Sequence, residues 1–329
     1  MLRIFHNTNY DFIRWWKWAA GLTAAFLLVG LVSYIMSPIN YSIEFTGGTM
    51  LQVEFKQPID VGQLRDRLTE AGMEGAEITQ FGSDREYTIR AQDAAQVAAQ
   101  DSAAGSVANR IRGVLQSTYG ADGVTVARTE AVGARVGDEL QRNALIALLI
   151  SFLITLVYLA VRFEWRMGLA AVVATAHDFI ATLVFLKLMH LEVSLMVVAG
   201  LLTVIGYSMN DTVIIFDRLR EDLRKNRKES LYDTLNRSIN ETLPRSVITH
   251  SLSLSSVIAL LILGGDVIRP FAWVMGFGIF TGTFSSMYVA APILIWIYRK
   301  WPKKTSVTQR SSTATRTSPT KRSTATAAM

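Results

Sequence analysis

Long apolar runs separated by short charged segments dominate the chain. A membrane-spanning helix needs about 20 mostly apolar residues, and six runs have a suitable length: 19–36, 143–161, 167–186, 193–216, 245–263 and 271–298. The run at 143–161 contains no charged residue, whereas the run at 245–263 is the weakest of the six. The pattern predicts a polytopic α-helical membrane protein with six transmembrane helices.

The segment at 37–142, between the first two runs, has a different periodicity. Two stretches repeat apolar residues at helical spacing, 60–72 and 95–120, and four read as strands: 49–55, 75–81, 86–91 and 124–132. The order βαββαβ predicts one small α+β domain of the ferredoxin-like type. Its sequence contains no acid–base pair and no metal-ligand cluster, which favours a binding or mechanical role.

Lysine and arginine residues predict the orientation in the membrane. They flank the apolar runs at 1–18, 162–166, 217–244 and 299–329, whereas the alternate connections are poor in them. The positive-inside rule therefore places both termini and the basic loop at 217–244 in the cytoplasm. The domain at 37–142 would then lie in the periplasm, if the source is a Gram-negative bacterium. The first run has no small-residue cleavage site after it, so we expect it to remain as a span.

The amino-acid composition is consistent with a membrane protein that also has a polar domain. Half of the residues are apolar, the mean hydropathy is +0.27 and 18% are charged, which fits membrane spans combined with a polar domain. The net charge of +6 arises in the Ser/Thr-rich segment 302–329, which holds six of the 33 basic residues and none of the 27 acidic ones. We expect the tail at 299–329 to be a disordered, solvated cytoplasmic segment. Binding of this tail to anionic lipid or ribosomal RNA is the less favoured alternative.

Several classes of enzyme are disfavoured by the residues present. The chain has no cysteine and only four histidines, none in HExxH spacing, and it has no GxxxxGK[ST] loop. Thiolate metal sites, zinc hydrolases and P-loop ATPases are therefore poor interpretations. We expect neither an enzyme nor a metal or cofactor site.

Asp211 is the principal candidate for function, because it lies late in the apolar run at 193–216. A charged side chain at the centre of a membrane costs about 2.5–3.5 kcal/mol on insertion scales. Such a carboxyl is tolerated when it is protonated and neutral, or when a cation accompanies it. Arg245, at the start of the next run, suits the cation role because it stays charged at any working pH. A moving partner that switches Asp211 between these states would make it a proton carrier; the alternative is a static ion pair that fixes helix register.

Other polar and small residues in the spans are secondary candidates. Arg245 opens a predicted polar stripe with Thr249, Ser253 and Ser256. The possible supporting residues are Tyr207, Asn210, Thr249, His177 and Asp178. For the last two, a simple hydrogen bond to a neighbouring helix is the favoured alternative. The glycines of the last run, Gly276, Gly278 and Gly282, predict close helix contact, and the last two have GxxxG spacing.

Several of these residues fall in motifs that closely resemble the SecF family, within the SecD/SecF family of the resistance-nodulation-division superfamily. The motifs are IEFTGGT (43–49), VRFEWRMGLAA (161–171), the HD pair at 177–178, LLTVIGYSMNDTVIIFDRLRE (201–221), NRSINETLPRSVITHS (236–251) and GIFTGTFSSMYVAAP (278–292). The resemblance covers residues 10–300 and excludes the tail.

The resemblance implies a function in protein export. Asp211 and Arg245 match the family's aspartate and arginine of the proton relay. The family is a six-span half-transporter that works with SecD to promote late steps of precursor translocation across the inner membrane, using the proton-motive force. Protons are then the coupling ion, and the implied partners are SecD on a separate chain, the SecYEG channel, YajC, the translocating precursor and membrane lipid, with no specific nucleic acid.

The sequence departs from the family pattern at two positions. Glu44 stands where an aspartate usually precedes FTGG, and His250 replaces a small polar residue next to the expected proton path. Two rival interpretations stay open: a non-transporting assembly subunit that only scaffolds other spans, and a proton-driven exporter of small molecules or lipids. The second usually needs a large second periplasmic domain and a second half, which this sequence lacks.

Overall fold

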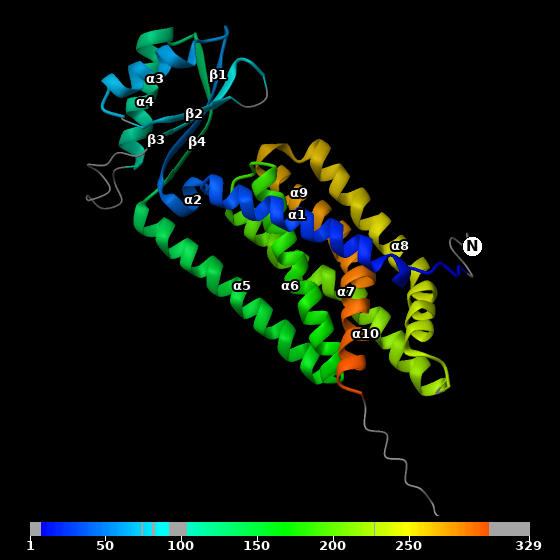
Figure 1. The fold of residues 1–329 in the computed structure, drawn as a ribbon. Helices are drawn as coiled ribbons and strands as arrows, with labels where there is room; N and C mark the ends of the chain where they lie inside the picture. The colour runs from blue at the N-terminus through cyan, green and yellow to red at the C-terminus, as the bar shows by residue number, and fades with distance from the viewer. Residues whose placement is uncertain (1–7, 74, 81–82, 92–103, 227, 303–329) are drawn as a thin grey trace, which may run out of the picture.

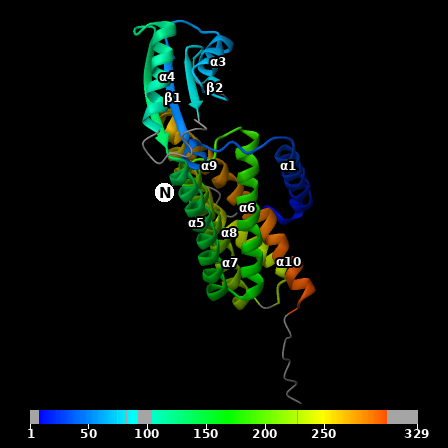
Figure 2. The same ribbon diagram turned by 90° about the vertical axis from the view of Figure 1, so that its left-hand side faces the viewer.

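The computed structural model describes residues 8–73, 75–80, 83–91, 104–226 and 228–302. A small αβ domain lies at one end of a bundle of long helices (Figures 1 and 2). Within the described residues, six helices or helical runs are long and apolar enough to cross a membrane. This result confirms the predicted six-helix architecture. The predicted tail from residue 303 onward and the first half of the predicted helix at 95–120 lie outside the described residues.

The αβ domain contains a four-stranded sheet in the order β2-β3-β1-β4, in which every neighbouring pair is antiparallel. The strands are β1 (Gly48–Phe55), β2 (Glu77–Gln80), β3 (Glu86–Ala91) and β4 (Val124–Val132). Helix α3 (Val61–Glu70) joins β1 to β2, and α4 (Ala104–Tyr119) precedes β4. The element order is therefore the predicted βαββαβ. Alternate residues of β1, including Leu51 and Val53, pack in one core with Leu64 and Ile111 of the two helices.

The bundle consists of long helices joined by short turns. They are α1 (Trp16–Met36), α5 (Ala134–Arg162), α6 (Trp165–Leu188), α7 (Leu195–Lys225), α8 (Leu231–Leu263), α9 (Gly265–Ser285) and α10 (Ala291–Lys300). The π-helical turn η2 (Ser286–Ala290) joins α9 to α10, so these form the sixth span. Two short helices complete the elements: η1 (Ile13–Trp15) and α2 (Ile43–Thr46).

The connection at 217–244 differs from the expected loop, because α7 and α8 extend through most of it. The sequence-based interpretation placed the start of the next helix just after Pro244, but Pro244 lies inside α8. The helix begins instead at Ser230, whose hydroxyl accepts a hydrogen bond from Asp233 N at 3.1 Å. Serine is among the best N-cap residues, so this local signal, and not the proline, fixes where α8 begins.

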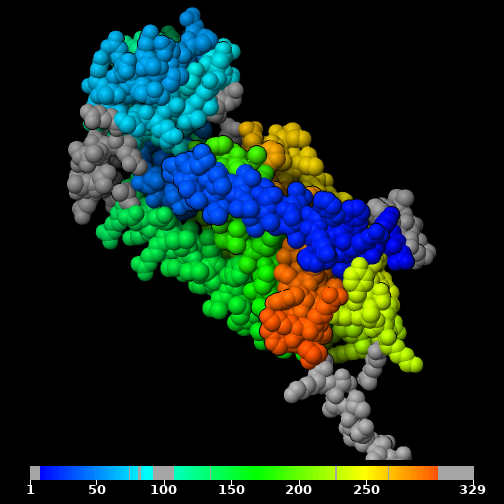
Figure 3. Space-filling view, viewed as in Figure 1, coloured from blue at the N-terminus to red at the C-terminus, as the bar shows by residue number. Residues whose placement is uncertain are grey.

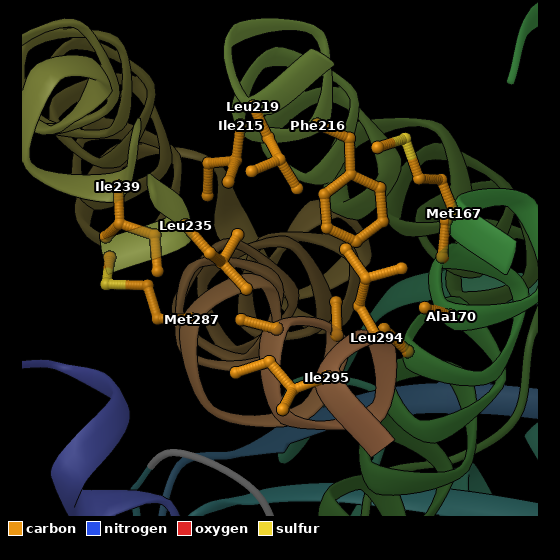
Figure 4. Close-up of a cluster of buried hydrophobic side chains, with 14 of the residues drawn as sticks. Met167, Ala170, Ile215, Phe216, Leu219, Leu235, Ile239, Met287, Leu294 and Ile295 are labelled. Carbon is orange, nitrogen blue, oxygen red and sulfur yellow. The ribbon is translucent and has the colours of Figure 1, made fainter. Parts of the chain in front are cut away.

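The helices divide into an inner and an outer set. About half of the most apolar window is buried in α6, in α7 and in the α9–α10 span (50%, 50% and 56%), whereas α1, α5 and α8 bury only 11%, 6% and 17%. Helix α1 accordingly runs across the outside of the bundle (Figure 3). A buried hydrophobic cluster that includes Met167, Phe216, Leu235 and Leu294 joins α6, α7, α8 and α10 (Figure 4). The contacts among these inner helices can therefore enclose polar side chains.

The αβ domain is attached to the bundle at the start of α7. The Glu44 carboxylate accepts a hydrogen bond from Leu195 N at 2.6 Å, and Arg90 of β3 forms an ion pair with Glu192. Gly47 and Gly48 follow α2 with φ values of 69° and 118°, a region that glycine enters without strain. Gly47 and Gly48 therefore allow the chain to turn from α2 directly into β1 while Glu44 of α2 keeps its hydrogen bond to Leu195 of α7.

Candidate functional site

Asp211 lies in the middle of α7 and is enclosed by α8. The residue is 3% exposed, and its Oδ2 lies 3.0 Å from Nε2 of His250. Its other oxygen, Oδ1, accepts a hydrogen bond from Ser246 Oγ at 3.3 Å. Both partners come from α8, so the buried carboxyl is held by an imidazole and a hydroxyl.

Arg245, the predicted partner of Asp211, is exposed and points elsewhere. Among the residues that the structure describes, it has neither an ion pair nor a hydrogen bond. It lines a cavity of about 1030 Å³ at the charged ends of α7 and α8, together with Arg218, Glu221 and Glu241. The structure thus holds the two predicted relay residues apart, with one in an open, charged cavity and the other buried.

The polar side chains of α8 that face α7 differ from the predicted stripe, because Ser246 and His250 take the places predicted for Arg245 and Thr249. Ser246, His250 and Ser253 contact α7, where Tyr207 donates a hydrogen bond from its hydroxyl to Ser253 Oγ at 2.9 Å. Adjacent residues on an α-helix point about 100° apart, so Arg245 and Thr249 lie on the neighbouring face. Of the predicted stripe, only Ser253 takes part in these contacts.

Asp178 of α6 is a second buried carboxyl and is 1% exposed. Its Oδ2 accepts hydrogen bonds from Ser208 of α7 and from Ser285 of α9, the latter at 2.5 Å. Its Oδ1 lies 2.9 Å from Nδ1 of His177. The predicted His177–Asp178 pair therefore does form, and its carboxyl joins three inner helices at one point.

The two carboxyl groups belong to one polar layer across the inner helices. Ser208 and Asp211 are one turn apart on α7, and Thr212 of the same helix exchanges a hydrogen bond with Ser286 at 2.8 Å. A Cβ at Gly282 would lie only 2.9 Å from the Cα of Ser208, so this glycine lets α9 approach α7 closely. Gly278 similarly faces Val204, while Gly276 is in looser contact with Val257. Asn210, in contrast, is exposed.

Thr283 of α9 also belongs to this layer, because its Oγ1 lies 3.0 Å from Nδ1 of His250. Sequence reasoning missed most of the hydroxyl groups in the layer, namely Ser208, Ser246, Thr283, Ser285 and Ser286. Serine and threonine in membrane helices often bond to their own backbone, so their type alone does not mark them. Their spacing does carry a signal, because Ser208 and Thr212 are four residues apart. His250 was recognised only as a neighbour of the path, whereas it contacts Asp211 directly.

The described part of the chain contains no group of three or more histidine, aspartate or glutamate side chains that could hold a metal ion. What the site offers is a set of groups that can hold and pass protons. Buried ionisable residues within membrane helices commonly mark ion or proton pathways. The fold and the site together define the class: a multi-pass membrane protein with a small αβ domain and a buried carboxyl–imidazole pair.

Comparison with known proteins places this chain within that class. The family described as protein export membrane protein SecD/SecF, C-terminal, matches residues 114–300, and the SecD/SecF GG motif matches residues 35–59. The chain therefore belongs to the SecD/SecF family of protein-export membrane proteins.

Relatives and solved structures agree with this assignment. A protein translocase subunit SecF of Gemmatimonas aurantiaca is 57% identical over 92% of this chain and 91% of its own length. One from Escherichia coli O157:H7 is 36% identical over 87% of each chain. The crystal structure of SecDF from Thermus thermophilus superposes with a TM-score of 0.78 at 32% identity, covering 91% of this chain but 40% of the solved one. This chain thus spans nearly the full length of those SecF relatives and less than half of the SecDF chain.

Proposed function

We propose that this chain is a proton-coupled subunit of the protein-export machinery, in which Asp211 takes up and releases the coupling proton. The observation that carries the proposal is the burial of Asp211, at 3% exposed, in an inner helix beside a second protonatable group. A purely structural carboxyl in a membrane is costly. A carrier needs such a position, because it must be shielded from the solvent on at least one side.

The cavity around Arg245 supplies the second element of the proposal. It is open and lined by charged groups, and it includes Val213 and Ile214, which follow Asp211 by two and three residues on α7. A proton that enters this cavity from the side of the membrane where the Lys- and Arg-rich flanks lie therefore comes within one helical turn of Asp211. Arg245 then acts in another state of the cycle, in which it approaches the ionised carboxylate and stabilises it.

The αβ domain and the positions of the basic flanks support the proposed orientation in the membrane. The strand order β2-β3-β1-β4, with every pair antiparallel, is the one expected for a ferredoxin-like domain. The basic flanks at 162–166 and 299–300 fall at the end of the bundle opposite this domain. This asymmetry supports a periplasmic domain and cytoplasmic termini in an inner membrane.

The apolar surface of the outer helices supports a partner within the membrane. This chain covers 40% of the chain in each of two SecDF crystal structures to which it is similar. The weakly buried outer helices α1, α5 and α8 leave apolar surface available to a second half. We therefore include SecD as a separate partner chain, with SecYEG, YajC and the translocating precursor as further partners of the assembled machine. The role is assistance to late translocation by the proton-motive force.

The test is export of a secreted precursor by cells whose only SecF is this chain, supplied with its cognate SecD. Asp211→Asn and Arg245→Met should reach the membrane at normal levels, export slowly and show little further loss with an uncoupler. Asp138→Asn, at an exposed carboxylate near the start of α5, is the matched control and should export normally. Wild-type export by Asp211→Asn would instead support a subunit that only scaffolds its partners.

A further inference from the structure

His250 contacts Asp211 more closely than any other charged or protonatable side chain among the described residues. The side chain of His250 is 9% exposed, and its Nε2 lies 3.0 Å from Asp211 Oδ2. On its other side, Nδ1 lies 3.0 Å from Oγ1 of Thr283 in α9. The ring is therefore held between two inner helices, and it bridges a hydroxyl and a carboxyl.

The hydrogen bonds of Thr283 determine which ring nitrogen carries a hydrogen. The Thr283 hydroxyl donates to Ile279 O at 2.9 Å, as threonine often does within a helix. Its oxygen is then left to accept, and the nearer donor is His250 Nδ1–H, since Nε2 is farther away at 3.4 Å. In the neutral ring Nε2 then bears a lone pair. A lone pair and a carboxylate oxygen would repel each other at 3.0 Å, so the contact requires one proton between them.

From this geometry we propose that His250 shares and carries the coupling proton, so that the proton site is the Asp211–His250 pair and not the aspartate alone. This inference rests on the proposed function of Asp211. In the transfer, the Oδ2–H bond of Asp211 breaks and an Nε2–H bond forms on His250. A neutral acid and neutral imidazole become a carboxylate and an imidazolium, and no other reactant is consumed.

The charge balance of the pair suits a membrane interior. With one proton the pair is neutral on either side of the transfer, so no net charge appears in the apolar layer during that step. Ser246 Oγ donates to Oδ1 and so favours the carboxylate form. Thr283 accepts from Nδ1–H and so favours the imidazolium. These two hydrogen bonds thus stabilise the Asp211 carboxylate and the His250 imidazolium that are present after the transfer.

Few other titratable groups face His250. From α7, besides the paired aspartate, only Tyr207 approaches, with ring centroids 5.5 Å apart. Residues 279–287 include none, Tyr288 of η2 lines another cavity with Trp16 and Tyr232, and the cations of α10 lie in its last turn at 299–300. On α8 itself Arg245 lies five residues earlier, in the charged cavity. A pH-dependent change in rate that is lost in a His250 variant would therefore report on the pair.

The experiment measures precursor translocation into inverted membrane vesicles that contain this chain and its cognate SecD. The uncoupler-sensitive rate is followed from about pH 5.5 to 8.5, the range in which histidine titrates. His250→Gln keeps a side-chain amide near Asp211 but cannot carry a proton. We expect it to lose the pH step of the wild type and to lower the uncoupler-sensitive rate by about tenfold or more. His190→Gln, at an exposed histidine after α6, should match the wild type.

A second pair of variants keeps His250 and changes only the group that orients it. Thr283→Val removes the acceptor for Nδ1–H at similar volume and should displace the pH step, whereas Thr283→Ser should restore the wild-type profile. If His250→Gln inserts and retains the wild-type rate and pH profile, the inference is overturned. If it fails to insert, identical profiles for Thr283→Val and Thr283→Ser would overturn it. Asp211→Asn separates the two proposals, because wild-type export by that variant would refute the proposed function itself.

Discussion

Replacement of Asp178 tests whether the junction of α6, α7 and α9 is held by hydrogen bonds. Its carboxylate accepts from Ser208 and Ser285 through one oxygen and contacts His177 through the other. Asp178→Leu fills a similar volume but removes all three interactions and leaves the two serine hydroxyls to find other partners. Asp178→Asn keeps an oxygen for both serines and turns an NH2 group toward His177.

The magnitude follows from the number of contacts. Hydrogen bonds between membrane helices contribute about 0.6 kcal/mol on average and up to about 1.7 kcal/mol each. Three lost interactions therefore amount to about 2–5 kcal/mol, the upper limit applying if every bond is strong. At 1.4 kcal/mol for each factor of ten, the lower figure already changes the unfolding equilibrium constant by about 30-fold. Asp178→Asn should cost less than about 1 kcal/mol because its oxygen and NH2 group can satisfy the same partners.

The assay is unfolding of the purified chain in mixed micelles with increasing dodecyl sulfate, followed by far-ultraviolet circular dichroism. Asp178→Leu should unfold at a clearly lower detergent fraction than the wild type, and Asp178→Asn close to it. Phe280→Ala, at a 66% exposed side chain of α9, serves as the control for a change on the outer surface. Equal stability of Asp178→Leu and the wild type would refute the argument, as would equal losses for the leucine and asparagine variants.

Three further predictions concern packing and the attachment of the αβ domain, and all use the same micelle assay. Glu44→Ala removes the group that accepts the hydrogen bond from Leu195 N and should lower the unfolding free energy by about 1 kcal/mol. Glu44→Gln keeps an acceptor oxygen and should lower it by less. Gly282→Val forces an isopropyl group against the α7 backbone and should cost about 1–3 kcal/mol, whereas Gly21→Val, with nothing within 4 Å of its Cβ position, should be neutral. Phe216→Ala leaves a cavity at a fully buried position and should lower the unfolding free energy by about 3–5 kcal/mol, measured as a shift of the same transition. A decrease of less than 1 kcal/mol would contradict the packing in Figure 4.

Sequence patterns predicted the elements well wherever one periodicity governed a whole segment. The strands at 86–91 and 124–132 have the expected bounds, and the apolar run at 167–186 lies within α6. Length and apolar content are sufficient for such elements, because a membrane helix must satisfy its own backbone whatever its neighbours are. The short helix α2 was not anticipated, since its four residues contain no helical period.

The partner of Asp211 could not be obtained in the same way. Its identity depends on which face of α8 meets α7, and one residue rotates that face by about 100°. The sequence pattern predicted a helix that begins at Arg245, just after Pro244, whereas the helix already extends from Leu231. The contacts of His250 with both Asp211 and Thr283 arise from three helices, and no local sequence signal specifies such a meeting.

The arrangement of α7 links the two ends of the proposed mechanism. Its first residue, Leu195, is hydrogen-bonded to Glu44 of the αβ domain, and Asp211 lies sixteen residues later, about 24 Å along the same helix at 1.5 Å per residue. No proline interrupts this stretch, and α7 is one continuous helix from Leu195 to Lys225. Under the proposed function, a change in the contacts that hold Asp211 against α8 would be transmitted along α7 to the point at which the αβ domain is attached. We propose this displacement as the physical connection for proton-driven movement of that domain.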